Sequence, residues 1–275
     1  MPAIERLLAD HGVDAFEIQD PSTVSSVASG RLRIIAYGLC SMAETLRQDF
    51  KRRDVKASLD IVPFEDTEWT ERWKEFLSAV VIADRLVVRP PFRDSPASEL
   101  PEIVVDPGMA FGTGGHETTR LALELALDVC VPEGVPIDGP IADVGCGSGV
   151  IAASLARLGC SEIDACDIDP VAIEVAREVM QRNGVGDQIQ LIEGSVDSLG
   201  QTYPVVVVNI ISEVLLQLAP SLDAKLHPGG MLILSGILCE ESERFTEQFL
   251  AQFPGTVELQ RSEGDWMGLV VRHAG

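Results

Sequence analysis

Short apolar runs alternate with amphipathic segments from about residue 140 to the end of the sequence. The runs PIADV, EIDACDI, QIQLIEG, VVVVNI and MLILSGI have the length of strands, whereas segments such as VAIEVAREVMQR have the apolar spacing of helices. Runs that are apolar at every position, such as Val205 to Val208, fit strands that are buried on both faces. The alternation predicts a doubly wound, largely parallel α/β sheet, with TVELQRS and WMGLVVR as an antiparallel hairpin at its edge.

Glycine, proline and capping residues indicate where the helices of this region begin and end. Gly159 is expected to end the helix VIAASLARL in a left-handed conformation. Asp169 is expected to cap the next helix, with Pro170 in its first turn and Gly184 at its end. A further helix is expected from about 213 to 226, followed by the turn HPGG.

The chain divides into three predicted regions. Residues 1–62 have the pattern of a small α+β unit, with strands at AFEIQ, RLRIIAYG and VKASLDIV. Residues 63–100 hold a linker helix, EDTEWTERWKEFL, and a connecting segment. Residues 101–275 form the predicted sheet domain, so the site is expected there.

Charge and cysteine content limit the classes of function. The chain of 275 residues carries 21 basic and 43 acidic residues, a net charge of −22, which argues against a bare DNA or RNA binder and favours a basic partner, although many acidic proteins are simply soluble. Its six cysteines include no CxxC pair, and no apolar run is long enough to span a membrane. The opening MPAIERLLADHG lacks the apolar core of a secretion signal. We therefore expect buried free thiols and a cytoplasmic location.

The loop DVGCGSG follows the first strand of the predicted sheet, where such folds bind their ligands most closely. Gly145, Gly147 and Gly149 allow a tight turn and a close approach of the backbone to a ligand. Asp167 ends the second strand, at the position where a carboxylate accepts hydrogen bonds from the ribose hydroxyls of a nucleotide. A loop that serves packing alone is the alternative.

The spacing of these glycines favours S-adenosylmethionine over NAD. Dinucleotide sites have the spacing GxGxxG, which turns a helix N-terminus toward a pyrophosphate, whereas this loop has the spacing GxGxG. Asp143 is expected at the mouth of the site, where it disfavours an anion and suits a cationic sulfonium. No residue is assigned to a metal, because HETT lacks the second histidine of HExxH.

Two further segments are candidates for the same site. Asn209 ends the strand VVVVNI at the carboxyl edge of the sheet, where its amide can either donate to and accept from a ligand or form a turn. The second segment, DPGMAFGTGGHETT, contains four glycines and runs into a helical pattern, as expected of a loop close to a ligand. His116 of this segment could be a base, but we favour a hydrogen bond that braces the loop.

The chain resembles the bacterial ribosomal protein L-eleven (L11) methyltransferase family. The resemblance covers most of the sequence and is carried by DPGMAFGTGGHETT, DVGCGSG, DIDPVAIEVARE, VVVVNII, LHPGGMLILSGIL and Trp266. It implies a seven-stranded Rossmann-like methyltransferase sheet with a small ferredoxin-like N-terminal domain. The implied reaction transfers a methyl group from S-adenosylmethionine to lysine or N-terminal amines of ribosomal protein L11. From its charge and hydropathy we expect the chain to bind neither DNA nor membranes, and we expect a monomer.

The resemblance also implies roles for particular residues. Asp167 would hold the ribose, Gly145 and Gly147 the methionine part, and Thr119 its carboxylate end. Asn209 would position the cofactor or the incoming amine, and Phe111 would exclude water beside the sulfonium. No residue is assigned as a general base.

Two departures from the family pattern and three rival functions remain at this point. Gly115 stands where the family usually has threonine, and the chain is expected to lack the first strand of the small domain, which leaves an open edge for a partner strand or a loop. The rivals are a methyltransferase of another protein or small molecule, an inactive cofactor-binding module in ribosome assembly, and a nicotinamide enzyme. NIIS in place of NPPY argues against a glutamine methyltransferase.

Overall fold

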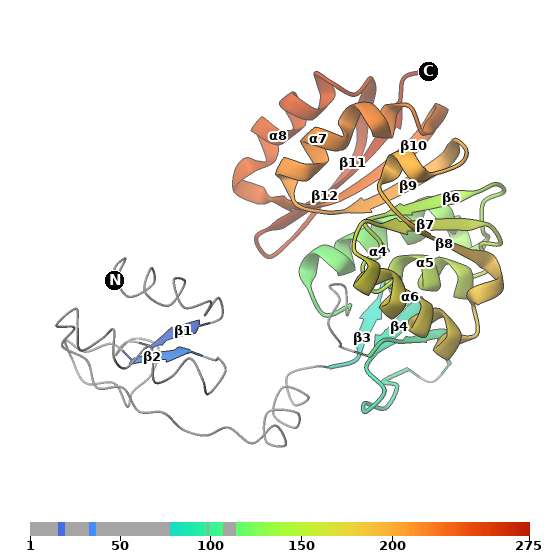
Figure 1. The fold of residues 1–275 in the computed structure, drawn as a ribbon, viewed down its shortest axis with the longest axis vertical. Coiled ribbons are helices and arrows are strands. Elements are labelled where there is room, and N and C mark those ends of the chain that lie inside the picture. The colour runs from blue at the N-terminus through green and yellow to red at the C-terminus, as the bar shows by residue number, and fades with distance from the viewer. Residues whose placement is uncertain (1–15, 20–32, 37–77, 98, 107–113) are drawn as a thin grey trace. The chain divides into compact units, whose positions relative to one another are not determined.

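The computed structural model describes residues 16–19, 33–36, 78–97, 99–106 and 114–275, in a chain that divides into two compact units, residues 1–72 and 73–275. In the first unit, β1 (Phe16–Gln19) pairs antiparallel with β2 (Arg33–Ala36) (Figure 1). Both strands were predicted from AFEIQ and RLRIIAYG. The helices and the third strand predicted for this region, and the linker helix, lie outside the described residues.

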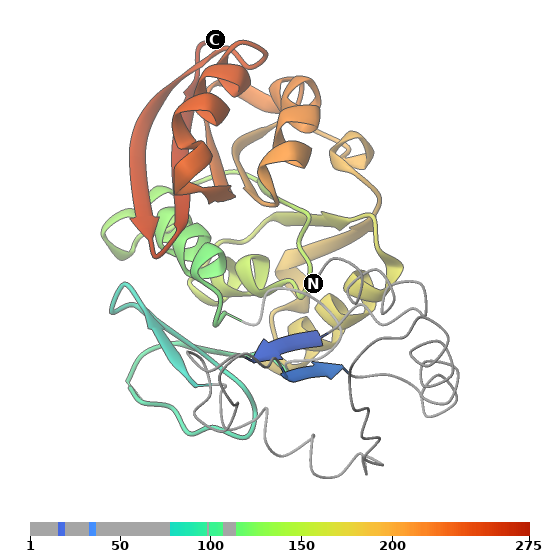
Figure 2. The same cartoon turned by 90° about the vertical axis from the view of Figure 1, so that its left-hand side faces the viewer.

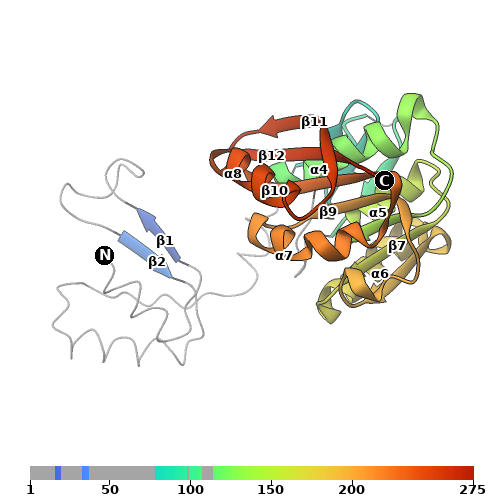
Figure 3. The ribbon, with the colours of Figure 1, turned by 90° about the horizontal axis from the view of Figure 1, so that it is seen from above.

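The second unit is built on a seven-stranded sheet with the order β11-β12-β10-β9-β6-β7-β8. Neighbouring strands are parallel among β10, β9, β6, β7 and β8. Strand β12 runs antiparallel to β10 and to the outermost strand β11 (Figure 3). This arrangement confirms the predicted doubly wound sheet with a terminal hairpin. The strands are β6 (Ile141–Val144), β7 (Ile163–Asp167), β8 (Ile189–Glu193), β9 (Tyr203–Asn209), β10 (Leu226–Leu238), β11 (Gly255–Glu263) and β12 (Trp266–His273).

Helices cover both faces of this sheet (Figure 2). A separate cluster of apolar side chains is buried on each face. One face packs against α4, α5 and α6, and the other against α7 and α8. Successive residues of one strand enter different clusters, as Val206 and Val207 of β9 do, because successive side chains of a strand point to opposite faces. The helices are α4 (Glu117–Cys130), α5 (Val150–Arg157), α6 (Pro170–Asn183), α7 (Ser212–Asp223) and α8 (Ser242–Leu250).

The predicted helix ends are present. Gly159 follows α5 with φ +102°, and Gly184 follows α6 with φ +65°, both in the left-handed region. The Asp169 carboxylate accepts a hydrogen bond of 2.8 Å from the Val171 amide at the start of α6. The HPGG segment is not a separate turn, since it lies within β10, where the pairing with β9 shifts register between Leu226 and Met231.

A second, three-stranded sheet was not predicted from the sequence. β3 (Val80–Ile82) pairs antiparallel with β4 (Leu86–Arg89), which pairs parallel with β5 (Glu102–Val104). Ile82, Leu86, Val88 and Ile103 of this sheet join the apolar cluster of α4, α5 and α6. The Asn183 side chain at the end of α6 fixes β5, because it accepts from the Val104 amide (2.8 Å) and donates to the Val104 carbonyl (2.9 Å).

The connections between parallel strands differ at one place. An α-helix lies in each of the connections β6 to β7, β7 to β8 and β9 to β10. The connection from β8 to β9 contains only the three-residue 3-10 helix η3 (Val196–Ser198). The remaining short 3-10 helices are η1 (Pro132–Gly134), η2 (Gly186–Gln188) and η4 (Cys239–Glu241).

Candidate active site

Three predicted site residues meet at the carboxyl edge of the sheet because the strands that carry them are neighbours. β6 pairs with β7 on one side and with β9 on the other, so that Val144 lies opposite both Cys166 and Val208. The next residues along the three strands are Gly145, Asp167 and Asn209. The parallel register therefore places a glycine loop, a carboxylate and an amide side by side, as the sequence predicted.

The loop between β6 and α5 depends on its glycines. Gly145, Gly147 and Gly149 have φ values of +69°, +53° and +73°, which other residues rarely adopt. A β-carbon at Gly145 would also lie 2.4 Å from Cδ1 of Ile210. The loop is held down by the Cys166 carbonyl, which accepts from the Gly145 amide at 2.8 Å.

The Asp167 carboxylate organises the loops on both sides of it. Oδ2 accepts a hydrogen bond of 2.9 Å from the Gly147 amide, and Oδ1 accepts one of 3.0 Å from the Asp169 amide. A carboxylate has about four acceptor positions, so this half-buried group can still accept from a ligand hydroxyl. Its position suits the predicted contact with a ribose.

Asp143 lies elsewhere than predicted. The sequence pattern predicted it at the mouth of the site, but strand alternation turns its side chain toward α5, where it is only 1% exposed. Oδ2 accepts from the Ala152 amide at 3.1 Å and so satisfies one free N–H group of the first turn of α5. Burial, and secondarily the charge of Asp167, raise the pKa of Asp143 to about 7.

The first turn of α4 forms another wall of the site. His116 caps the helix, because its Nδ1 accepts from the Thr118 amide at 3.3 Å, and its ring packs edge-on to Trp266 with centroids 5.4 Å apart. This agrees with the predicted bracing role. Arg120 donates to the Gly115 carbonyl and forms a hydrogen bond of 2.8 Å to Glu263, which ties the end of the glycine-rich segment to β11.

Ser235, for which no role was predicted, joins the end of β9 and β10 to the first turn of α4. Ser235 lies opposite Asn209 in the pairing of β10 with β9, and its buried Oγ donates to the Thr118 carbonyl at 2.8 Å. The backbone of the next residue, Gly236, has φ +91°, and a β-carbon there would lie 2.4 Å from the Ile210 carbonyl oxygen. The motif LSGIL thus supports the carboxyl end of β9, and its unexplained polar serine was the signal available in the sequence.

The remaining predicted site residues have polar groups that a ligand could use. Asn209 is half-buried, and within the described part of the chain its side chain has no hydrogen-bond partner. Thr119 is completely buried, yet its Oγ1 has no partner there, nor has Oδ1 of Asp143. A buried polar atom without a partner costs about 1–3 kcal/mol, so the Thr119 hydroxyl fits a site completed by a polar ligand, whereas Oδ1 of Asp143 lies beneath the glycine loop and away from that site. Phe111 lies outside the described residues.

The described residues contain neither a group of three potential metal-binding side chains nor a helix long and apolar enough to cross a membrane.

Comparison with known proteins identifies the family. A family model described as ribosomal protein L11 methyltransferase (PrmA) matches residues 3–274. The chain belongs to this family. Its membership agrees with the resemblance of the sequence motifs and with the Rossmann-like seven-stranded sheet.

Individual members of the L11 methyltransferase family give the same result. The ribosomal protein L11 methyltransferase of Pelobacter propionicus is 40% identical over 215 residues, which cover 76% of this chain and 68% of that protein. The one from Gloeobacter violaceus is 34% identical over 261 residues, 93% of this chain and 80% of that protein. The crystal structure of the ribosomal protein L11 methylase from Lactobacillus delbrueckii subsp. bulgaricus superimposes with a TM-score of 0.62 at 30% identity, covering 72% of this chain and 99% of that one.

Proposed function

We propose that this protein transfers methyl groups from S-adenosylmethionine to amino groups of ribosomal protein L11, at lysine side chains, at the N-terminal amine, or at both. The observation that carries the proposal is the convergence of the glycine loop, Asp167 and Asn209 on three adjacent strands in a member of the L11 methyltransferase family. The net charge of −22 is electrostatically compatible with a basic protein substrate.

The geometry supports assigning a different part of the cofactor to each of these residues. Asp167 holds the ribose, because its carboxylate keeps acceptor capacity beside the loop that it organises. Gly145 and Gly147 let the backbone lie against the methionine part. Thr119 holds the carboxylate end, since its buried hydroxyl is a donor without a partner in the described chain. These assignments, and that of Phe111 beside the sulfonium, are proposals.

Asn209 is proposed as the positioning residue for the reaction. When bound, the cofactor supplies an electrophilic methyl group on a positively charged sulfur. The transfer requires the amine nitrogen about 3–3.5 Å from the methyl carbon and in line with the departing sulfur. The Asn209 amide can accept from the amine or donate to the cofactor, and Ser235 on β10 fixes the strand end that carries it.

The incoming amine must be neutral when it reacts. A lysine with an ordinary pKa of about 10.4 is mostly protonated at pH 7, so transfer into a dry pocket, or loss of its proton to water, has to supply the free amine. Asp143 lies beneath the loop and binds the Ala152 amide, so it is not assigned as a general base. We further propose a cytoplasmic monomer that binds neither DNA nor a membrane.

The mass of purified ribosomal protein L11, measured after incubation with the protein and S-adenosylmethionine, tests the substrate. We expect an increase by whole methyl groups, and peptide mapping assigns them to amines. A ribosomal extract with labelled cofactor is the parallel test, and label on other bands with none on L11 rejects the substrate assignment.

Calorimetry of the Asp167→Ala variant tests the site independently of any substrate. Loss of hydrogen bonds to a charged group, at about 1.5–3 kcal/mol each, predicts S-adenosylmethionine binding weaker by about tenfold or more. Asp187→Ala, at an exposed carboxylate of η2, is the control and should bind as the wild type does. Equal affinities for the two variants contradict the ribose role.

A further inference from the structure

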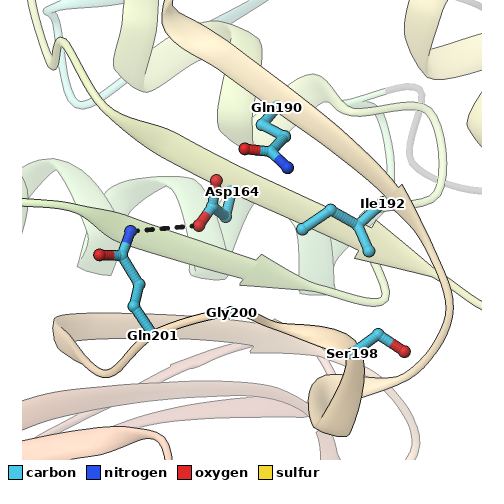
Figure 4. Close-up of a pocket in the computed structure, with 6 residues that line it drawn as sticks. All are labelled: Asp164, Gln190, Ile192, Ser198, Gly200 and Gln201. Carbon is cyan, nitrogen blue, oxygen red and sulfur yellow. Dashed lines mark hydrogen bonds between the residues drawn. The ribbon is translucent and has the colours of Figure 1, made fainter.

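A concave site separate from the candidate active site lies on the sheet face opposite the helices α4, α5 and α6. It is an open cavity of about 350 Å³ beside β7 and β8, at the connection that contains η3 in place of an α-helix. In the other connections between parallel strands, an α-helix covers the corresponding part of the sheet. Figure 4 shows the side chains around it, and the lining residues are Asp164, Gln190, Ile192, Ser198, Gly200 and Gln201.

Asp164 provides a fixed carboxylate in this cavity. The residue is only 7% exposed, and its Oδ2 accepts from the Tyr203 hydroxyl at 2.6 Å and from Nε2 of Gln201 at 3.3 Å. Burial, together with the hydrogen bond to Asp164, raises the pKa of Tyr203. The phenol therefore stays protonated and acts as the hydrogen-bond donor to Asp164. Oδ1 has no hydrogen-bond partner in the described chain and is not among its fully enclosed polar atoms, so it remains accessible from the cavity.

A second carboxylate lies beside the first. Nε2 of Gln201 also donates to Oε1 of Glu162 at 3.2 Å, so one amide group bridges the two acids. Neither acid forms an ion pair with a described residue, whereas Glu102, for example, pairs with Arg89 at 2.7 Å. Lys225 of the adjoining segment donates instead to the Leu199 carbonyl. The cavity is therefore lined by the Asp164 carboxylate, with Glu162 beside it, and no described basic residue forms an ion pair with either acid.

We propose that this cavity binds the guanidinium or ammonium group of a basic side chain of the protein substrate, as a docking site separate from the transfer site. This inference rests on the proposed function for the identity of the substrate. The cationic head would donate to Oδ1 of Asp164 and to Glu162, while Ile192 and the Gln190 stem contact its aliphatic part.

The position of the cavity determines what it can affect. Asp164 precedes Asp167 by three residues on β7 and points to the opposite face from Ala165. At about 3.3 Å per residue, the two carboxylates are separated by about 10 Å along the strand. A side chain held at Asp164 therefore belongs to another part of the substrate than the reacting amine. It contributes to the binding of the protein substrate and not to the chemical step.

Steady-state kinetics of Asp164→Asn test this separation. Asparagine keeps the shape and an oxygen for the Tyr203 hydroxyl but removes the charge. We expect the KM for ribosomal protein L11 to rise about tenfold and to depend less on salt, with kcat and the affinity for S-adenosylmethionine unchanged. Asp187→Asn, with the same charge change at an exposed residue outside the cavity, should leave all of these values unchanged. An unchanged KM in Asp164→Asn, or an equal rise in both variants, overturns the proposal.

A binding measurement on the wild-type protein tests the cavity without any need for activity. Ethylguanidinium is titrated into ¹⁵N-labelled protein, and the side-chain amide resonances of Gln201 and Gln190 are followed. We expect a saturable shift of these resonances and no saturable shift at Gly145 or Gly147. In the variant Glu162→Gln, which removes the exposed carboxylate beside Asp164, the affinity for ethylguanidinium should be lower. Absence of a saturable Gln201 shift overturns the docking site. A protein that shows the shift but does not methylate L11 retains the cation site and loses the proposed function.

Discussion

The Asp143→Asn variant should remove a pH-dependent loss of stability. The buried carboxyl group of Asp143 has its pKa raised from 3.8 to about 7 by burial, with a smaller contribution from the charge of Asp167. As the pH rises above about 4, the unfolded chain releases this proton while the folded chain still retains it. The unfolded state then binds fewer protons than the folded state, so the free energy of unfolding falls as pH rises toward 7 and levels off above it.

The size of the effect follows from the two pKa values. A difference of about three units corresponds to about 4 kcal/mol when both states are ionised. About 2 to 3 kcal/mol of this develops between pH 5 and pH 8. Asparagine can still accept from the Ala152 amide but carries no charge, so it lacks this contribution. The unmatched NH₂ group of asparagine shifts the stability of the variant by a constant amount and leaves its pH dependence unaffected.

Urea unfolding at several pH values between 5 and 8 measures this difference. Trp266 reports on the second unit when Trp69 and Trp73 are replaced by phenylalanine in every protein compared. The unfolding free energy of Asp143→Asn, relative to the parent, should increase by about 2 to 3 kcal/mol from pH 5 to pH 8. Asp187→Asn, at an exposed carboxylate, serves as the control and should run parallel to the parent. A parallel curve for Asp143→Asn would refute the argument, because it would mean that the fold leaves this carboxyl near its ordinary pKa.

Two further substitutions test the residues that support the site. Ser235→Ala removes a buried hydrogen bond to the start of α4, so it should lower the free energy of unfolding by about 1 to 2 kcal/mol and weaken S-adenosylmethionine binding. The control Ser154→Ala, equally buried and bonded within α5, should lower stability alone, and equal affinities of the two variants in calorimetry contradict the role of Ser235. Gly236→Ala should lower the free energy of unfolding in urea by about 2 kcal/mol or more, because its β-carbon would meet the Ile210 carbonyl. This loss should exceed that of Gly229→Ala, where φ is similar but the space is open, and equal losses would show that only the strain at positive φ matters.

The features that could be predicted from the sequence are local in the chain. The left-handed φ values of the DVGCGSG loop require glycine, and the cap at Asp169 with Pro170 depends on adjacent residues, so both are recorded in a few consecutive letters. The side-by-side placement of Gly145, Asp167 and Asn209 could also be predicted, because parallel neighbouring strands end at the same edge of a sheet.

The features that the sequence did not predict depend on contacts between distant residues or on weak local patterns. β3 and β5 have three residues each, too few to show a periodicity. Asp143 has the same neighbours in sequence whether it lines the site or caps α5, and only the packing of α5 on that face of the sheet decides between them.

The class of sheet, the glycine loop with its acid, and the family could all be inferred from residue spacing along the chain. Which polar groups are buried, and what they contact, depends on how the elements pack in three dimensions. The bond from Ser235 to Thr118 joins residues 117 positions apart, and the Asp164 cavity combines two strands with a segment 37 positions away. Such contacts arise when apolar surfaces pack together, and the polar side chains carried with them acquire partners that their sequence neighbours do not specify.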